Sequence, residues 1–119
     1  MRLQEAELDV EALPYERFER FGVRSLTDAE LLAIIIRTGS GMHTPMEIGQ
    51  KILSLDGGNR RGLNSLYHVT VEELMQIDGI GKVKAIKLKC IAELSRRMAS
   101  HPDFALVFMK WIRLPEPAE

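Results

Sequence analysis

DGIGKVKA, residues 78–85, is the stretch of this sequence that decides its fold. Gly79 and Gly81 predict a tight turn, because glycine reaches positive φ without steric cost. A short helix is expected before the turn, ending near Ile77, and a longer one after it, over residues 82–99. Two helices joined by a glycine–apolar–glycine turn form a helix-hairpin-helix, and the sequence predicts this motif at the centre of the domain.

The residues around the turn have the spacing of two helices that pack together. Thr70 and Glu73 form a capping box, in which each side chain bonds the backbone amide of the other residue. Leu74 and Ile77 lie on one face of the helix that follows. Ala85, in the second helix, is small enough to let the two helices approach. The agreement of these positions favours a packed helix pair over two unrelated glycines.

The N-terminal end of the second helix is the candidate binding site. Amides at such an end attract anions, because the helix dipole is positive there. We expect the Ile80 and Gly81 amides to hold a phosphate oxygen of DNA and Gly79 to shape the turn. Lys82 and Lys84 would add positive charge beside this anion site. The alternative is a hairpin that only packs, with its glycines serving as helix caps.

The charge of the chain limits how it could bind a nucleic acid. Charged residues make up 28% of the sequence and the net charge is −1, which excludes a generally basic nucleic-acid binder. Four arginines stand against eight acids in residues 1–30, whereas eight basic residues stand against four acids in residues 60–99. Any DNA contact should therefore be local, involve few phosphates and depend strongly on salt.

Several features place the chain in the cytoplasm, away from membranes. The N-terminus lacks the basic-then-apolar pattern of a signal peptide. The apolar stretch over residues 104–112 is interrupted by Lys110 and is too short to span a bilayer. The single cysteine, Cys90, permits no internal disulfide, and its helical setting predicts a buried thiol in a reducing compartment.

No pattern in the sequence indicates catalysis, a metal or a cofactor. His43, His68 and His101 have no metal-ligand spacing to one another or to Cys90. No Gly-x-Ser-x-Gly nucleophile elbow is present. Asp78, in the hairpin, is expected to bind nearby turn amides and not to act as a catalytic acid. The chain is predicted to be a binding module and not an enzyme.

The N-terminal part is predicted to begin with an acidic, loosely held arm at residues 1–13. Pro14 suits the first position of a short helix that Gly22 ends. Tyr15, Phe18 and Phe21 recur every three residues along this helix. An aromatic stripe near nucleic acid could stack on bases, but core packing is the better interpretation, so these rings are expected to face the core.

Two further helices with capping boxes are predicted before the central motif. Thr27 and Glu30 start the first, whose apolar run at residues 31–36 requires burial on most sides. Thr44 and Glu47 start the second, with proline at its first helical position. Residues 63–68 are expected to add one short helical turn.

A weak internal repeat connects the two halves. The turn Gly39-Ser40-Gly41 precedes Gly79-Ile80-Gly81 by forty residues, which suggests two helix hairpins related by a pseudo-two-fold axis. The register departs at Arg37, which takes the place of Ile77, and at Pro45, which takes the place of Ala85. No phosphate is assigned to the first hairpin.

The end of the chain carries unusual apolar surface. On the helix of residues 82–99 one stripe is expected to be buried, formed by Val83, Ile86, Cys90, Ile91, Leu94 and Met98. His101-Pro102 ends this helix. The segment that follows, from Phe104 to Ile112, has the spacing of an amphipathic helix. It is predicted to be helical and buried, either against the preceding helix or across a two-fold homodimer.

Five stretches resemble the N-terminal region of the bacterial RadC family: PYERF (14–18), LTDAELLAI (26–34), RTG (37–39), EELMQIDGIGKVKA (72–85) and AELSRR (92–97). The resemblance covers residues 14–99. It implies a helical domain with a helix-hairpin-helix, in a family that carries a DNA-repair name. RadC proteins continue into a zinc-metalloprotease-like domain with a His-x-His…Ser…Asp signature. This sequence holds no such signature, so that activity is not carried over.

The sequence as a whole predicts an all-α fold. A small helical domain over residues 14–100 is expected between the acidic arm and an apolar helical tail, residues 101–119, whose end is disordered. The predicted function is a DNA-binding module of a RadC-like DNA repair protein that contacts the backbone without sequence specificity. The alternative is a protein-interaction or oligomerisation module in which the hairpin is only structural.

Overall fold

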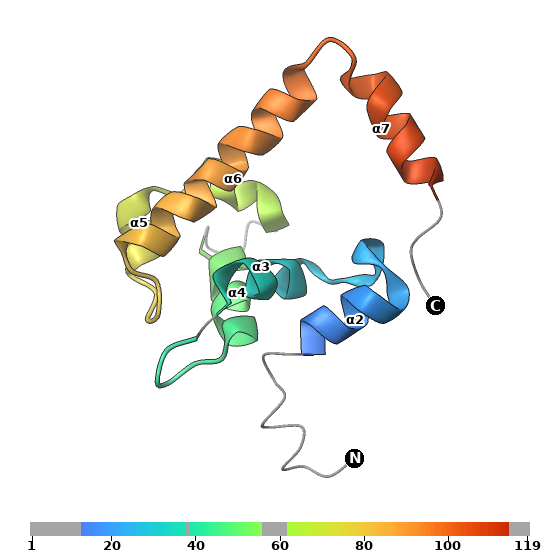
Figure 1. Cartoon of the computed structure of the whole chain (residues 1–119). Helices are drawn as coiled ribbons and strands as arrows, with labels where there is room; N and C mark the ends of the chain where they lie inside the picture. Colours follow the sequence, from blue (N-terminus) through green and yellow to red (C-terminus); the bar gives the residue numbers. More distant parts are fainter. Residues whose placement is uncertain (1–12, 38, 56–61, 115–119) are drawn as a thin grey trace.

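The computed structural model describes residues 13–37, 39–55 and 62–114 (Figure 1). Every regular element in these ranges is a helix, which confirms the all-α class. The predicted acidic arm, apart from Leu13, lies outside the described residues, as does the predicted disordered end beyond Leu114.

Six α-helices and two 3₁₀ helices follow one another along the described chain. In order they are α2 (Leu13–Phe21), η1 (Val23–Ser25), α3 (Asp28–Ile36), α4 (Pro45–Leu53), η2 (Gly62–Tyr67), α5 (Val71–Met75), α6 (Lys82–Ser100) and α7 (Phe104–Arg113). These bounds lie within a few residues of the predicted ones. The helix before the central turn is shorter than predicted, because regular α-helix ends at Met75 and not at Ile77.

Three helices of the described chain begin with the predicted capping boxes. In each box a threonine hydroxyl accepts the amide of the glutamate three residues on, and the glutamate carboxylate accepts the threonine amide. The donor–acceptor distances run from 2.8 to 3.2 Å. The pairs are Thr27–Glu30 in α3, Thr44–Glu47 in α4 and Thr70–Glu73 in α5.

The hydrophobic core lies where the pair α3–α4 meets η2, α5 and the first half of α6. Its largest fully buried apolar side chains are Leu32, Ile48, Ile52, Leu74 and Leu88. Ala85 is also fully buried, as expected of a small residue where two helices come close. The packing of these elements places the turn between α5 and α6 at one edge of the molecule (Figure 1).

The aromatic side chains of α2 do not face the core, and that prediction is wrong. Tyr15, Phe18 and Phe21 are all exposed. Instead, α2 contacts α3 through polar groups: the Arg17 guanidinium lies 2.9 Å from the carboxylate of Glu30. A helix at the edge of a small domain has a neighbour on one side only, and a spacing of three residues does not say which side that is.

The predicted buried stripe of α6 is also wrong in most of its members. The buried side chains of α6 are Ala85, Leu88 and Ala92. The exposed ones include Val83, Ile86, Leu94, Met98 and the Cys90 thiol. Leu94 and Met98 lie in the second half of α6, which extends past the core (Figure 1), so they find no neighbour to cover them. Val83 and Ile86 lie in the first half, where Ala85 and Leu88 are the side chains that meet the core.

The tail forms the predicted helix, but it is not buried against α6. Helix α7 leaves α6 at an angle after His101 (Figure 1), and most of its apolar side chains are exposed, with Phe104 and Ile112 half-buried. The far end of α7 is held from η1, where the Arg24 guanidinium donates to the carbonyl oxygens of Ile112 and Leu114 at 2.9 Å each. The burial predicted within one chain is therefore contradicted, while burial between two chains stays a prediction.

We expect Glu30→Gln to destabilise the fold more than Glu73→Gln. Both glutamines can still accept the amide that closes a capping box, but Glu30 is buried and paired with Arg17, whereas Glu73 is exposed. The expected loss is about 1–2 kcal/mol for Glu30→Gln and a few tenths for Glu73→Gln. Urea unfolding measures both. Equal losses would mean that the pairing with Arg17 adds no stability.

Candidate nucleic-acid interface

The turn between α5 and α6 is closed by its own backbone. The Ile77 amide donates to the carbonyl of Leu74 at 3.1 Å, and the Ile80 amide donates to the carbonyl of Ile77 at 3.0 Å. The side chains of Ile77 and Ile80 are buried, so the turn is anchored in the core from both sides of Gly79. Helix α6 then begins with Gly81 at its N-cap position.

The two glycines of the turn have different roles. Gly79 has φ of 100°, and a Cβ added there would lie 2.6 Å from Cδ1 of Ile48 and 3.2 Å from Cβ of Ser40. Gly79 is therefore required both for its conformation and for the close approach of α4. Gly81 has φ of −88° and ψ of −172°, which any residue adopts, and a Cβ there would meet no described atom within 4 Å. The positive φ predicted at Gly81 is wrong.

Helix α6 starts without a side-chain cap. In α3, α4 and α5 a threonine hydroxyl accepts one of the first amides, but Gly81 has no side chain to do so. The first amides of a helix have no acceptor within the helix. No described group accepts the amides of Gly81, Lys82 and Val83, and all three residues are exposed. The start of α6 thus presents open N–H groups to solvent.

The residues that were predicted to hold phosphate have different roles in the structure. The Ile80 amide was expected to bind a ligand, but it already donates to the Ile77 carbonyl and closes the turn, so it is not open. Lys82 is exposed, and no described residue pairs with it. Lys84 is half-buried, and its ammonium group donates to the Gly79 carbonyl at 3.4 Å, which supports the turn from inside. Gly81 and Lys82 therefore form the open part of the predicted site.

Three of the other basic side chains of α6 are engaged within the protein, whereas Lys87 is exposed and has no partner among the described residues. Lys89 donates to the carbonyl of Leu66 in η2 at 2.7 Å. Arg96 and Arg97 both bind the carboxylate of Glu93. Hydrogen bonds from Arg96 and then Arg97 lower the pKa of Glu93 to about 2, so it stays charged at neutral pH. Lys89, Arg96 and Arg97 are thus held by groups of the protein itself, although Glu93 supplies only one negative charge among them.

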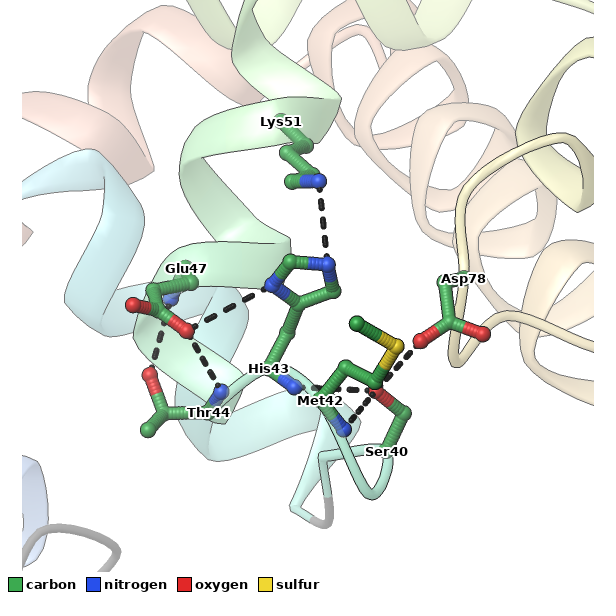
Figure 2. A network of polar contacts seen from close by, with 7 residues as sticks. All are labelled: Ser40, Met42, His43, Thr44, Glu47, Lys51 and Asp78. Carbon is green, nitrogen blue, oxygen red and sulfur yellow. Dashed lines mark hydrogen bonds and ion pairs between the residues drawn. The ribbon is translucent and has the colours of Figure 1, made fainter.

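A network in the loop before α4 joins the first hairpin to this turn (Figure 2). The Ser40 hydroxyl accepts the amides of Met42 and His43, at 3.1 and 3.0 Å, and donates to the carboxylate of Asp78 at 2.7 Å. Asp78 was expected to bind amides of its own turn, and this contact corrects that expectation. No local pattern could have found the pair, because the two residues are 38 positions apart in the sequence.

The same network continues into helix α4, through one side chain in its first turn and one in its last. Figure 2 shows the His43 ring between two side chains of that helix. Nδ1 of His43 lies 3.6 Å from the Glu47 carboxylate, and Nε2 lies 3.2 Å from the Lys51 ammonium group. Lys51 and Glu47 are therefore used to hold this loop in place beside Asp78.

The described residues contain no group of three or more His, Cys, Asp or Glu side chains that could hold a metal ion. None of their helices is long and apolar enough to cross a bilayer.

Comparison with known proteins identifies relatives over most of the chain. The family model described as UPF0758 N-terminal matches residues 6–86. A UPF0758 protein of Desulforamulus reducens is 40% identical over 110 residues, which is 92% of this chain and 45% of that protein. One from Moorella thermoacetica is 43% identical over 94 residues, or 79% of this chain and 39% of that protein. This chain spans less than half the length of these relatives. No solved structure gives a significant match.

The two glycines of the turn should respond differently to the same substitution. We expect Gly79→Ser to lower the free energy of unfolding by roughly 1–3 kcal/mol, because serine is strained at positive φ and its Cβ meets Ile48. Gly81→Ser should leave stability unchanged or raise it by a few tenths of a kcal/mol, because serine is a good N-cap. Thermal unfolding of both variants is the measurement. A loss at Gly81 as large as that at Gly79 would contradict this assignment.

Proposed function

Because this chain belongs to the UPF0758 family, whose N-terminal region it matches, we propose a function for that region: it binds the DNA backbone without sequence specificity. The contact would be made by the turn of residues 78–81 and the start of α6, acting as a helix-hairpin-helix. The resemblance to RadC, a family with a DNA-repair name, agrees with this proposal. The proposal includes a role in DNA repair and a location in the cytoplasm.

The observation that carries the proposal is the uncapped start of α6. Open amides at the positive end of a helix dipole favour a phosphate group. Lys82 lies in the first turn of the same helix, exposed and without a described partner. A helix of 19 residues that lacks the cap present on three shorter helices is suited to take its acceptor from outside the protein.

Each residue of the predicted site has a distinct role in this proposal. Gly81 and Lys82 would donate to the phosphate, through open amides and an ammonium group. Gly79 and Ile80 would hold the turn in shape, through positive φ and a buried side chain. Lys84 would support the turn through the Gly79 carbonyl and contribute charge from a second position.

These groups account for binding without sequence preference. Amides and ammonium groups recognise phosphates, which are the same at every base pair, whereas sequence is read from base edges. The carboxylate of Asp78 lies in the same turn and limits the attraction for DNA, although its bond to Ser40 holds it against the first hairpin. We therefore expect weak, salt-sensitive binding that involves few phosphates. Catalysis is not part of the proposal.

The pseudo-two-fold pair of hairpins also belongs to this proposal. The turn after α3 and the turn after α5 meet through Ser40, which bonds Asp78 and lies beside Gly79. A pair of hairpins related by an axis near this contact would bring both turns to one edge of the domain. Only the second turn would carry a phosphate. At the first turn, the start of α4 already has its Thr44–Glu47 capping box, and the His43 ring lies against the Glu47 carboxylate.

A second candidate function is protein interaction, with the hairpin serving only the fold. The exposed apolar surface of α7 favours it, since Leu106, Val107 and Trp111 are each at least half exposed. The two functions use opposite ends of α6, so they do not compete for the same residues. Assays with DNA separate them directly.

Lys82→Ala is expected to weaken binding to any duplex by a similar factor and to reduce the salt slope by roughly one unit. Fluorescence anisotropy with two unrelated duplexes, a single strand and a branched DNA, each at several salt concentrations, measures this. Lys110→Ala is the matched control, because it removes the same charge from α7. The proposal fails if neither variant differs from the unmodified chain, or if both lose affinity equally.

Gly81→Asp should separate binding from stability. A carboxylate at the N-cap accepts the first amides and suits the helix dipole, so the melting temperature should not fall. The same carboxylate would occupy the phosphate position and repel DNA, so affinity should drop at least tenfold. Gly81→Ser, which adds a neutral acceptor, should give a smaller loss. Unchanged affinity for Gly81→Asp in a stable protein would refute the site.

A further inference from the structure

An apolar groove of about 980 Å³ lies between the second half of α6 and helix α7. The two helices form an open angle (Figure 1), and the groove is lined by residues of both and of the link between them. The rings of Phe104 and Phe108 stack within α7 at a centroid distance of 5.4 Å. The main apolar side chains of the walls are Leu94, Met98, Phe104, Val107, Phe108 and Trp111.

The described helices cannot close this groove by themselves without losing contacts. The N-terminal end of α7 is joined to α6 by the short link at Pro102. The C-terminal end is held by Arg24, which donates to two carbonyl oxygens there. Folding α7 down onto α6 would break both of those hydrogen bonds. The groove is therefore preformed in a single copy, and no described segment of the chain covers it.

The area left open is close to what a stable dimer needs. Seven large apolar side chains of α6 and α7 are between 42% and 65% exposed. At roughly 100 Å² each they leave on the order of 700 Å² uncovered, against about 800 Å² per partner in a specific interface. The seven are Leu94, Met98, Leu106, Val107, Phe108, Met109 and Trp111.

We propose that a second copy of this chain fills the groove, so that two copies form a two-fold dimer with their α7 helices antiparallel. Each copy supplies both a groove and an apolar helix, which is the self-complementary surface that a two-fold interface requires. A partner that filled only the groove would leave Leu106 and Met109 in water, since they do not line it. A second copy would cover both the groove-lining face of α7 and the face that carries Leu106 and Met109.

The charges at the ends of α7 fit the antiparallel arrangement. Asp103 precedes the helix, whereas Lys110 and Arg113 lie in its last turn. In an antiparallel pair the basic end of one helix comes beside Asp103 of the other, a carboxylate that also contacts the His101 ring of its own chain, and the two helix dipoles also oppose. A parallel pair would bring like charges together. This inference does not rest on DNA binding, because the groove lies at the end of α6 away from Gly81.

Light scattering of the full chain over a wide range of concentrations tests the proposal. The expected mass at high concentration is about 27 kDa, twice the 13.5 kDa of one copy. Trp111 is the single tryptophan and about half exposed, so its emission should shift to shorter wavelength as the dimer forms. A constant mass of one copy, or a mass above two copies, would overturn the proposal.

A matched pair of variants places the interface. Val107→Lys puts a charge into the groove and should raise the dimer dissociation constant at least tenfold. Val83→Lys makes the same change in the first turn of α6, away from the groove. Val83 is more exposed than Val107, and this variant should leave the dimer dissociation constant unchanged. Circular dichroism checks that both variants keep their helices. Equal dimerisation of both variants, or equal loss in both, would overturn the proposed interface.

Discussion

The close approach of the turn at Gly79 to helix α4 is the contact on which the rest of this structure depends. The absence of a side chain at Gly79 lets Ile48, which is fully buried, lie directly against the backbone of the turn. The hydrogen bond from Ser40 to Asp78 closes the same contact on the outside. The two halves of the chain are therefore joined where each of them reverses direction, and α6 leaves from that junction.

Residues that hold the fold are followed directly, within this turn, by residues that are open to a ligand. Gly79 and Ile80 are committed to shape and packing, whereas Gly81 and Lys82 face solvent. A glycine N-cap lowers helix stability by only a few tenths of a kcal/mol relative to a serine or aspartate cap. The domain thus leaves its longest described helix uncapped at little cost in stability, and the amides there stay available for an anion.

The length of α6 explains the exposed surface at the other end of the molecule. Its 19 residues extend about 28 Å, and only the first half meets the core. Beyond Ala92 no described element packs over its apolar face except α7, which stands away from it and is held there by Arg24. One long helix therefore separates two surfaces of different chemistry, a polar turn with open amides and an apolar groove.

Local signals in the sequence were sufficient to locate the helices. The three Thr–Glu capping boxes and Pro45 act within four residues of each helix start, so the sequence alone determined where α3, α4 and α5 begin. Local residues also made three other features predictable: the positive φ of Gly79, the end of α6 after Ser100 and the helical state of α7. The all-α class and the relatedness to a RadC-like family could be predicted from the sequence as well.

Only the tertiary structure decided which surfaces are covered and which polar groups are used. Tyr15, Phe18 and most of the expected stripe of α6 are exposed, because burial depends on neighbours that arrive from distant parts of the chain. The use of the Ile80 amide within the turn and the bond between Ser40 and Asp78 follow from three-dimensional packing in the same way. A helix start is encoded by a few adjacent residues, whereas the side of a helix that meets the core is set by contacts between segments far apart in sequence.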